Sequence, residues 1–246
     1  MCALAGHNPA MTDLDYGAFD ALTFDCYGTL IDWETGILAA LRSVVPAGAA
    51  DDEQLLAEYG DAEGALEAGP YRRYREVAGE AMATVARAHG AEPTPDDVAR
   101  LGGSVVDWPP FPDSHEALSR LKTRYRLGVL TNCDDDLFAA SNRRLAVDFD
   151  WIVTAQQVGS YKPDARNFAA LTERLAADGV PKECILHVAQ SLFHDHAPAQ
   201  RLGFRSVWID RRHEQSGSGA TPASEARPDA TFPSMAAFAA AAVPDG

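Results

Sequence analysis

The chain is organised around a short apolar segment that ends in a carboxylate. Residues 22–24 have the composition of a buried strand, and Asp25 follows them directly. Gly28 then allows a sharp turn, which brings the hydroxyl of Thr29 within reach of any group that Asp25 attacks. Ligands of open α/β sheets bind at the carboxyl ends of the strands, so Asp25 is placed to act as a nucleophile. The alternative is a turn residue after an apolar strand, and the downstream segments favour the nucleophile.

Further apolar segments alternate with helical patterns along the rest of the chain. The segments expected as strands are 127–130, 151–153, 184–189, 203–209 and, at the edge, 229–232. The segments expected as helices between and after them are 115–124, 167–178 and 236–242. This alternation predicts an α/β fold in which a parallel sheet has helices on both faces. A polar stretch of Gly, Pro and Ser at 217–228 is expected to be a mobile loop.

A separate helical region lies between the first two strands. Apolar residues recur at helical spacing in segments 33–41, 51–69, 71–89 and 96–101. Gly69 and Pro70 separate two of these helices, and no strand pattern occurs between about residues 33 and 106. The sequence therefore predicts an all-helical insertion after the first strand.

Charge and composition narrow the classes of partner. The 246 residues carry a formal net charge of −15, which argues against nucleic acid and anionic membranes as partners. No run of eighteen apolar residues is present, so no segment is expected to span a membrane. Residues 1–15 lack the regions of a secretory signal and are expected to form a loose tail. The four cysteines show no metal-like spacing, and free thiols are typical of a cytoplasmic protein.

Three motifs resemble those of the haloacid dehalogenase superfamily. Residues 24–30, Phe-Asp-Cys-Tyr-Gly-Thr-Leu, closely resemble motif I, and the step Thr131-Asn132 resembles motif II. Lys162, within Tyr-Lys-Pro, resembles the lysine of motif III. With Tyr27 at this position, motif I resembles that of the type II (L-2-haloacid) dehalogenases. The phosphatase branch has a second aspartate there. That aspartate protonates the leaving group, and a phenol with a pKa of about 10 is a poor acid at neutral pH.

The resemblance covers roughly residues 20–235 and implies both a fold and an activity. It implies a Rossmann-like core, formed by residues 16–32 and 106–246, and a helical cap at residues 33–105. The implied reaction is hydrolytic dehalogenation of a small 2-haloalkanoic acid, of haloacetate or 2-halopropionate type, through an aspartyl ester on Asp25. The resemblance implies no cofactor and a small-molecule carboxylate as substrate. It is compatible with a homodimer, because relatives often dimerise.

The resemblance also assigns roles to individual side chains. Lys162 would lower the pKa of Asp25 and keep it ionised. Asp195, with Ser191, would orient Lys162 and the hydrolytic water, while Asn132 would donate to the leaving halide. The catalytic residues expected on this basis are Asp25, Lys162, Asp195 and Ser191. The substrate-binding residues expected are Tyr27, Thr29, Thr131, Asn132, His194 and Phe168.

Motif IV and the cap depart from the dehalogenase pattern. The dehalogenases have Ser-Ser-Asn-x-x-Asp at motif IV, whereas residues 190–195 read Gln-Ser-Leu-Phe-His-Asp. Phe168 stands where those enzymes have Tyr, and His194 stands where they have an aromatic residue lining the halide site. A histidine donor there would suit a small, strongly accepting halide such as fluoride. The cap arginine that holds the halide has no match near Glu58 and Tyr59. Its candidate substitutes, which could equally be solvated helix charges, are Arg72, Arg73 and Arg75.

Other functions stay open at this point. A Mg²⁺-dependent phosphatase of the same superfamily would use Asp25 and Asp195 as metal ligands, and Mg²⁺ is expected only in that case. Tyr27 and Gln190 argue against it. Another hydrolase of small carboxylates, or a binding module that keeps the fold without catalysis, is a further alternative. The acidic run 134–136 is expected to begin a helix rather than to hold a metal.

Overall fold

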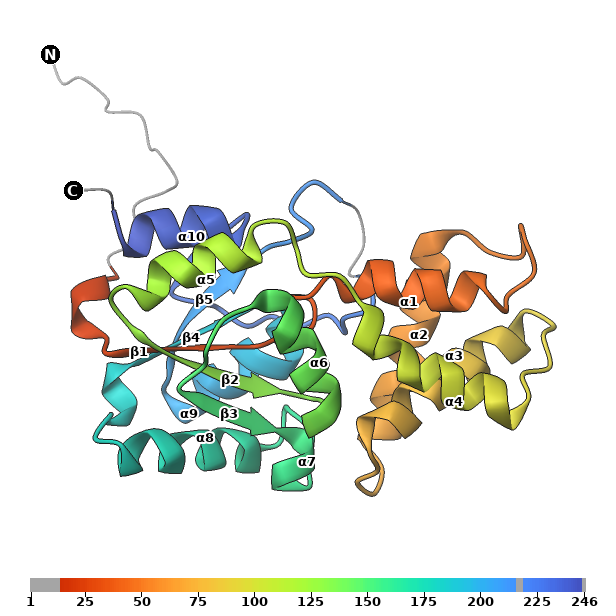
Figure 1. Cartoon of the computed structure of the whole chain (residues 1–246), viewed down its shortest axis with the longest axis horizontal. Helices are drawn as coiled ribbons and strands as arrows, with labels where there is room; N and C mark the ends of the chain where they lie inside the picture. The colour runs from red at the N-terminus through yellow and green to blue at the C-terminus, as the bar shows by residue number, and fades with distance from the viewer. Residues whose placement is uncertain (1–13, 216–218, 245–246) are drawn as a thin grey trace, which may run out of the picture.

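The computed structural model describes residues 14–215 and 219–244 of the chain. Its centre is a six-stranded sheet with the order β3-β2-β1-β4-β5-β6, in which every neighbouring pair is parallel (Figure 1). The strands are β1 (Ala21–Phe24), β2 (Arg126–Thr131), β3 (Trp151–Thr154), β4 (Ile185–Ala189), β5 (Arg205–Ile209) and β6 (Ala230–Phe232). The predicted α/β fold with a parallel sheet is thereby confirmed.

Helices cover both faces of the sheet. One face packs against α5 (Ser114–Lys122), α6 (Asp135–Leu145) and α10 (Met235–Ala242). The other face packs against α8 (Ala165–Ala177) and α9 (Ala197–Leu202). All four residues of β1 are buried, as expected for a parallel strand that is covered on both sides. The short elements are α7 (Ala155–Val158), 3₁₀ turns at Tyr16–Ala18, Ser104–Asp107 and Lys182–Cys184, and a π-helical turn at Leu192–His196.

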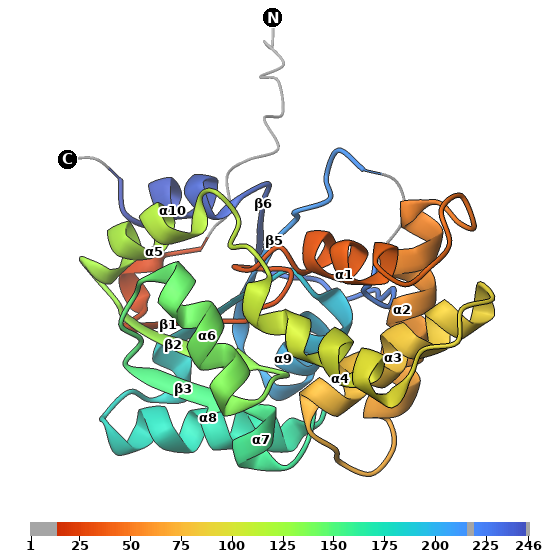
Figure 2. The ribbon, with the colours of Figure 1, turned by 45° about the vertical axis from the view of Figure 1, so that its right-hand side comes forward.

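The predicted helical insertion forms a body of its own beside the end of the sheet. Its helices are α1 (Trp33–Arg42), α2 (Asp52–Glu67), α3 (Tyr74–Ala88) and α4 (Pro95–Gly103). Figures 1 and 2 show them grouped next to the edge at which β2 and β3 end. Gly102 lets α4 approach α3 closely, because a Cβ there would lie 1.9 Å from the carbonyl oxygen of Arg75. This grouping supports the proposed division into a cap (33–105) and a core (16–32 and 106–246).

A carboxylate from the core fixes the cap helix α3. Both oxygens of buried Asp134 accept backbone N–H groups from the first turn of α3, Tyr74 at 3.0 Å and Arg75 at 3.1 Å. Asp134 does precede α6, as the acidic run predicted, but its side chain makes no hydrogen bond to that helix. Its carboxylate therefore accepts the free N–H groups at the start of cap helix α3 and not those at the start of α6.

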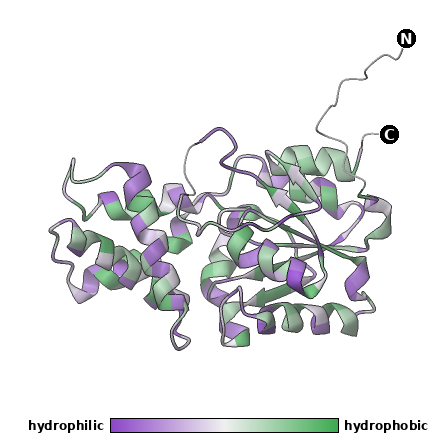
Figure 3. Cartoon of the chain, turned by 180° about the vertical axis from the view of Figure 1, so that it is seen from behind, coloured by the Kyte–Doolittle hydropathy of each residue, from purple (hydrophilic) through white to green (hydrophobic). Residues whose placement is uncertain are grey.

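The distribution of apolar residues follows these layers. Figure 3 shows apolar colouring along most of the strands, and polar and apolar segments alternating along most of the helices. Among the residues described, no helix is long and apolar enough to cross a membrane. Most of the expected tail 1–15 lies outside the described residues. At its end, Leu14 is buried and the carboxylate of Asp15 accepts the N–H of Gly17.

Candidate active site

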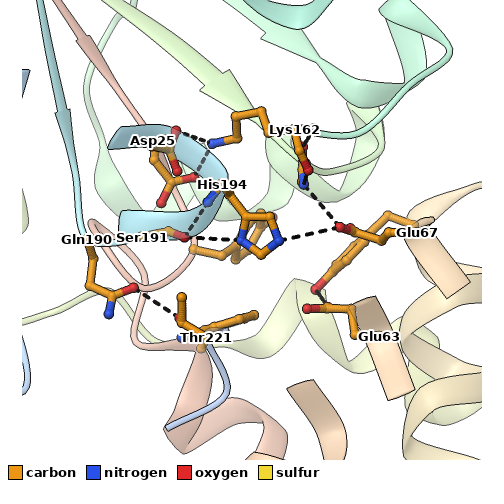
Figure 4. Close-up of a pocket in the computed structure, with 13 residues that line it drawn as sticks. Asp25, Glu63, Glu67, Lys162, Gln190, Ser191, His194 and Thr221 are labelled. Atoms are coloured by element: carbon orange, nitrogen blue, oxygen red, sulfur yellow. Dashed lines mark hydrogen bonds and ion pairs between the residues drawn. The ribbon is translucent and has the colours of Figure 1, made fainter. Parts of the chain in front are cut away.

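Asp25 lies at the end of the central strand and is held by two donors. Lys162 Nζ donates to Asp25 Oδ1 at 2.8 Å (Figure 4). Thr29 Oγ1 donates to Asp25 Oδ2 at 2.7 Å. Gly28 makes the turn between Asp25 and Thr29 with a φ of +88°, a conformation that favours glycine. The backbone N–H of Gln190 donates to Thr29 Oγ1 at 2.9 Å. The turn after β1 therefore orients both oxygens of the carboxylate.

The ammonium group of Lys162 bridges two carboxylates. Besides Asp25, it donates to Asp195 Oδ1 at 2.7 Å and to the carbonyl oxygen of Leu130 at 3.0 Å. These three bonds use all three N–H groups of the ammonium. Asn132 clamps the backbone of Lys162, because its Oδ1 accepts the Lys162 N–H at 2.7 Å and its Nδ2 donates to the Lys162 carbonyl at 3.1 Å.

Burial and pairing shift the pKa values of these groups in different directions. Burial opposes the charge on Lys162, but the carboxylates of Asp195 and Asp25 outweigh it and raise the pKa of the ammonium. Burial also opposes ionisation of Asp195, yet Lys162 and His187 hold the pKa of that carboxyl well below its usual range. For Asp25 burial is the larger effect and raises the pKa, while Lys162 acts against it. Lys162 therefore lowers the pKa of Asp25 as expected, but burial outweighs this effect and the net shift is upward.

The turn after β4 brings Ser191 and His194 to the site. Ser191 Oγ accepts the backbone N–H of His194 at 2.9 Å and lies 3.1 Å from His194 Nδ1. Burial lowers the pKa of His194 to about 4, so the ring is neutral at physiological pH. His196 points elsewhere, since its ring nitrogens meet Ser206 Oγ and the carbonyl oxygen of Ala189, both at 2.9 Å. Within residues 14–215 and 219–244, no group of three or more His, Cys, Asp or Glu is placed to hold a metal ion.

The cap contributes acids to the site that sequence reasoning missed. Glu63 and Glu67 lie one turn apart on α2 and both line the cavity. Glu63 Oε1 accepts the hydroxyls of Tyr59 at 2.6 Å and Tyr74 at 2.8 Å. Burial raises the pKa of Glu63 to about 7, and burial together with Glu63 raises that of Glu67. The sequence could have indicated that Glu63 faces inward, because it follows Tyr59 by four residues and so falls on the apolar stripe of its helix.

These side chains enclose a cavity of about 30 Å³ between cap and core. Its walls are formed by Asp25, Tyr27, Trp33, Glu63, Glu67, Tyr74, Asn132, Lys162, Gln190, Ser191, His194, Asp195 and Thr221. Thr221 belongs to the stretch that was expected to be mobile, and its hydroxyl donates to Gln190 Oε1 at 3.2 Å. The preceding Ala220 donates its N–H to Glu34 of α1 at 3.1 Å. Residues 219–221 of that stretch are therefore packed against the cap and the site, whereas residues 222–228 are half-buried or exposed.

Three residues expected at the substrate do not line this cavity. Thr29 is buried behind Asp25, to which its hydroxyl donates. Phe168 is buried on the far face of the sheet, with its ring centroid 5.3 Å from that of His187. Thr131 is buried at the end of β2, and its hydroxyl has no hydrogen-bond partner among the described residues. Tyr27 does line the cavity, but its hydroxyl lies 3.0 Å from Ser141 Oγ, inside the core. Arg72, Arg73 and Arg75 are not among the cavity residues.

The raised pKa of Glu63 makes stability depend on pH. Because its pKa in the folded chain, about 7, exceeds its unfolded value, the stability it contributes is present at low pH and is lost as pH rises from about 4 to 7. The shift corresponds to at most about 3 kcal/mol. We expect Glu63→Gln to reduce the loss of unfolding free energy between pH 5 and pH 8, measured by urea denaturation. Asp61→Asn, on the exposed side of α2, should leave the loss unchanged; equal pH dependence in all three proteins would contradict the assignment.

Comparison with known proteins agrees with this architecture. An L-2-haloacid dehalogenase structure from Xanthobacter autotrophicus superimposes with a TM-score of 0.75 at 22% identity, covering 90% of this chain and 97% of the other. A structure described as a dehalogenase with intermediate complex has a TM-score of 0.77 at 22% identity, with coverage of 93% and 99%. The family described as haloacid dehalogenase-like hydrolase matches residues 19–189. The chain belongs to this family.

Among the haloacid dehalogenase-like hydrolases, curated relatives of this chain carry a more specific name. A protein from Pseudomonas putida named (S)-2-haloacid dehalogenase is 27% identical over 201 residues, which cover 78% of this chain and 85% of the relative. A protein of the same name from Pseudomonas fluorescens is 27% identical over 199 residues, with coverage of 77% and 84%. The membership accounts for a parallel sheet that places Asp25, Lys162 and Asp195 at one edge.

Proposed function

We propose that this hydrolase removes the halogen from small 2-haloalkanoic acids through a covalent ester on Asp25. The observation that carries the proposal is the carboxylate of Asp25, which directly follows the central strand, is oriented by Lys162 and Thr29, and lines a small cavity between cap and core. The names of the curated relatives support the same reaction. Haloacetates and 2-halopropionates are the substrates we expect.

In the first step, an oxygen of Asp25 attacks the carbon that bears the halogen. The new carbon–oxygen bond forms as the carbon–halogen bond breaks, and the halide leaves with the bonding electron pair. This displacement inverts the configuration at the carbon. It divides one difficult substitution by water into two easier steps. Lys162 and Thr29 keep the attacking group aligned during the displacement.

In the second step, water attacks the carbonyl carbon of the aspartyl ester. The hydroxy acid is released, Asp25 returns to a carboxylate, and one proton passes to solvent. Asp195 lines the cavity, and its buried Oδ2 has no hydrogen-bond partner among the described residues. An unpaired buried carboxylate oxygen is costly, so we assign it to the hydrolytic water. Because its pKa is lowered, Asp195 orients this water rather than removing its proton as a strong base.

The cavity is small, about 30 Å³, so the route by which a substrate enters it is of interest. A wider hollow of about 440 Å³ shares Glu67, Lys162 and His194 with the cavity. It opens between the cap and the segment after β3. We assign this hollow as the access route, with Glu67 and His194 as the side chains that substrate must pass.

The hydrogen bonds made by Asp25 and Asp195 do not favour a Mg²⁺-dependent phosphatase. Three of the four oxygens of Asp25 and Asp195 accept hydrogen bonds from Lys162, Thr29 or His187. This set fits carboxylates bridged by an ammonium ion better than ligands of a divalent cation. The hydroxyl of Tyr27 is directed into the core and cannot protonate a leaving group in the cavity. The proposed reaction needs no cofactor.

Halide release from a small panel of acids tests the proposal. We expect fluoroacetate, chloroacetate or one enantiomer of 2-chloropropionate to release halide in the presence of EDTA. Phosphate release from p-nitrophenyl phosphate with Mg²⁺ should be absent. Mg²⁺-dependent phosphate release without halide release would contradict the proposal in favour of the phosphatase. Silence in both assays would favour another carboxylate substrate or the non-catalytic module.

A further inference from the structure

A buried histidine in the middle of β4 lies against Asp195. The side chain of His187 is fully buried, and its Nε2 lies 2.9 Å from Asp195 Oδ1. It does not line the cavity, and neither step of the proposed reaction uses it. Buried polar side chains cost free energy unless they are hydrogen-bonded, and both ring nitrogens of His187 have a partner.

The hydrogen between His187 and Asp195 belongs to the histidine. Asp195 Oδ1 is also the acceptor of Lys162 Nζ at 2.7 Å, because an ammonium group can only donate. An oxygen that accepts from an ammonium group at this distance is a carboxylate oxygen without a hydrogen of its own. His187 Nε2 must therefore carry the hydrogen of the 2.9 Å contact and donate it to Oδ1.

The neighbours of His187 fix the plane of its ring. Thr23 Oγ1 lies 3.0 Å from His187 Nδ1 and can donate to this atom or accept from it, so the contact holds in either protonation state of Nδ1. Thr23 and His187 are paired in register across β1 and β4, so their side chains lie on the same face of the sheet. The ring of Phe168 packs edge-on against the imidazole, with centroids 5.3 Å apart. The imidazole is thus held on several sides.

The turn after β4 brings Asp195 to this ring. Residues Leu192–His196 form a π-helical turn, in which the N–H groups of Asp195 and His196 both donate to the carbonyl oxygen of Ser191 at 3.2 Å. Such turns are frequent at functional sites. Asp195 Oδ1 has two donors, whereas Oδ2 has no hydrogen-bond partner in the part of the chain that the structure describes. The donors on Oδ1 therefore determine which oxygen of Asp195 is left for the cavity.

We propose that His187 is a positioning residue for the second step, in which it holds Asp195 so that Oδ2 is presented to the hydrolytic water. The inference rests on the proposed function. His187 Nε2 donates to Asp195 alone, whereas Lys162 also holds Asp25 and the carbonyl oxygen of Leu130. Loss of the imidazole N–H therefore leaves the nucleophile aligned but allows Asp195 to turn. Displacement of the halide should continue, and hydrolysis of the ester should slow.

His187 keeps its proton throughout this step. The water oxygen bonds to the carbonyl carbon of the ester, and the bond from that carbon to the oxygen of the hydroxy acid breaks. One hydrogen of the water ends on the released hydroxyl group, and the other passes to solvent as a proton. Asp195 and His187 are unchanged at the end, so their part is to hold the water in place.

Two substitutions of His187 test the role of its N–H group. His187→Leu removes the donor, whereas His187→Gln keeps an N–H close to the position of Nε2. Single turnovers of chloroacetate, quenched with acid, give the amount of ester on the Asp25 peptide by mass spectrometry. In His187→Leu we expect the ester to accumulate and its hydrolysis to slow by about 10²-fold. In His187→Gln the hydrolysis should stay within about threefold of the wild-type rate.

The steady-state constants provide a second readout that a purely structural role would not produce. The value of kcat/KM covers the steps up to the irreversible release of halide, so His187→Leu should leave it within about threefold of wild type. A loss of kcat/KM without accumulated ester would overturn the proposal, as would a His187→Gln variant that behaves like His187→Leu. The control is His115→Leu, an exposed residue of α5 on the opposite face of the sheet, which should behave as the wild-type protein.

A measurement without turnover separates this inference from the proposed function. In ¹H–¹⁵N spectra of the wild-type protein labelled at histidine, we expect an exchange-protected Nε2 proton of His187, assigned by its loss in His187→Gln. A His187 without a proton on Nε2 would overturn the proposal even if His187→Leu does not fold. Absence of halide release from every acid of the panel would refute the proposed function, and this signal would then still support the contact of His187 with Asp195. Halide release without the signal would leave the function standing and refute the role of His187.

Discussion

Asp25→Asn is expected to abolish halide release, with a loss of roughly 10⁴-fold or more in kcat. An amide has no nucleophilic oxygen anion, so no ester can form. The substitution is isosteric and its oxygen can still accept from Lys162 or Thr29. Folding should therefore be retained, and the loss should lie in the chemical step. Halide release under saturating substrate, with circular dichroism as a check of folding, measures this.

The matched control is Asp20→Asn, an exposed aspartate just before β1. It should release halide at the wild-type rate. If Asp25→Asn retained more than a small fraction of the activity, water would have to attack the substrate directly, and the covalent route would be wrong.

Lys162→Met is expected to remove activity and to destabilise the fold as well. Lys162 is 2% exposed and bridges Asp25 to Asp195. Without it, two buried carboxylates lie close together with no cation between them. Removing one partner of a buried ion pair costs about 3–5 kcal/mol. We expect an unfolding free energy lower by about that amount, measured by urea denaturation at pH 8.

The deficit of Lys162→Met should shrink toward acidic pH. In the variant, the pKa of Asp25 rises further and that of Asp195 rises above its unfolded value, so both carboxyls can become neutral as pH falls. The difference from the wild-type protein should therefore be larger at pH 8 than at pH 5. Lys122→Met, at a half-exposed ion pair with Asp150, should change stability by no more than about 1 kcal/mol. A deficit of Lys162→Met that did not vary with pH would contradict the role of the ammonium.

The parts of the fold that depend on local patterns could be predicted from the sequence. The apolar run before Asp25, the turn at Gly28 and the helical periodicity between residues 33 and 106 each have a local physical cause, and each element formed close to its predicted bounds. The lysine of motif III also came to lie beside Asp25, because parallel strands bring their carboxyl ends to one edge of the sheet.

The parts that depend on how helices and loops face one another could not be predicted in this way. Glu63 and Glu67 reach the cavity only because α2 turns one face toward the core. Phe168 was placed by its position in a motif, but the direction of its side chain is set by packing on the far face of the sheet. Thr221 comes from a polar stretch without periodicity; its hydroxyl bonds to Gln190, and the preceding Ala220 bonds to Glu34 of the cap. The partner of Asp134 could not be predicted either, since its carboxylate accepts N–H groups of α3 instead of those of the adjacent α6.

The most direct test of the covalent route is a single turnover in H₂¹⁸O with enzyme in excess over substrate. Water attacks the carbonyl carbon of the ester, so ¹⁸O should appear in the peptide that contains Asp25, and the hydroxy acid should carry unlabelled oxygen. Mass spectrometry of the product and of the proteolytic peptides reads out both. Label found in the hydroxy acid, with none in the Asp25 peptide, would show that water displaces the halide directly and would contradict the covalent mechanism.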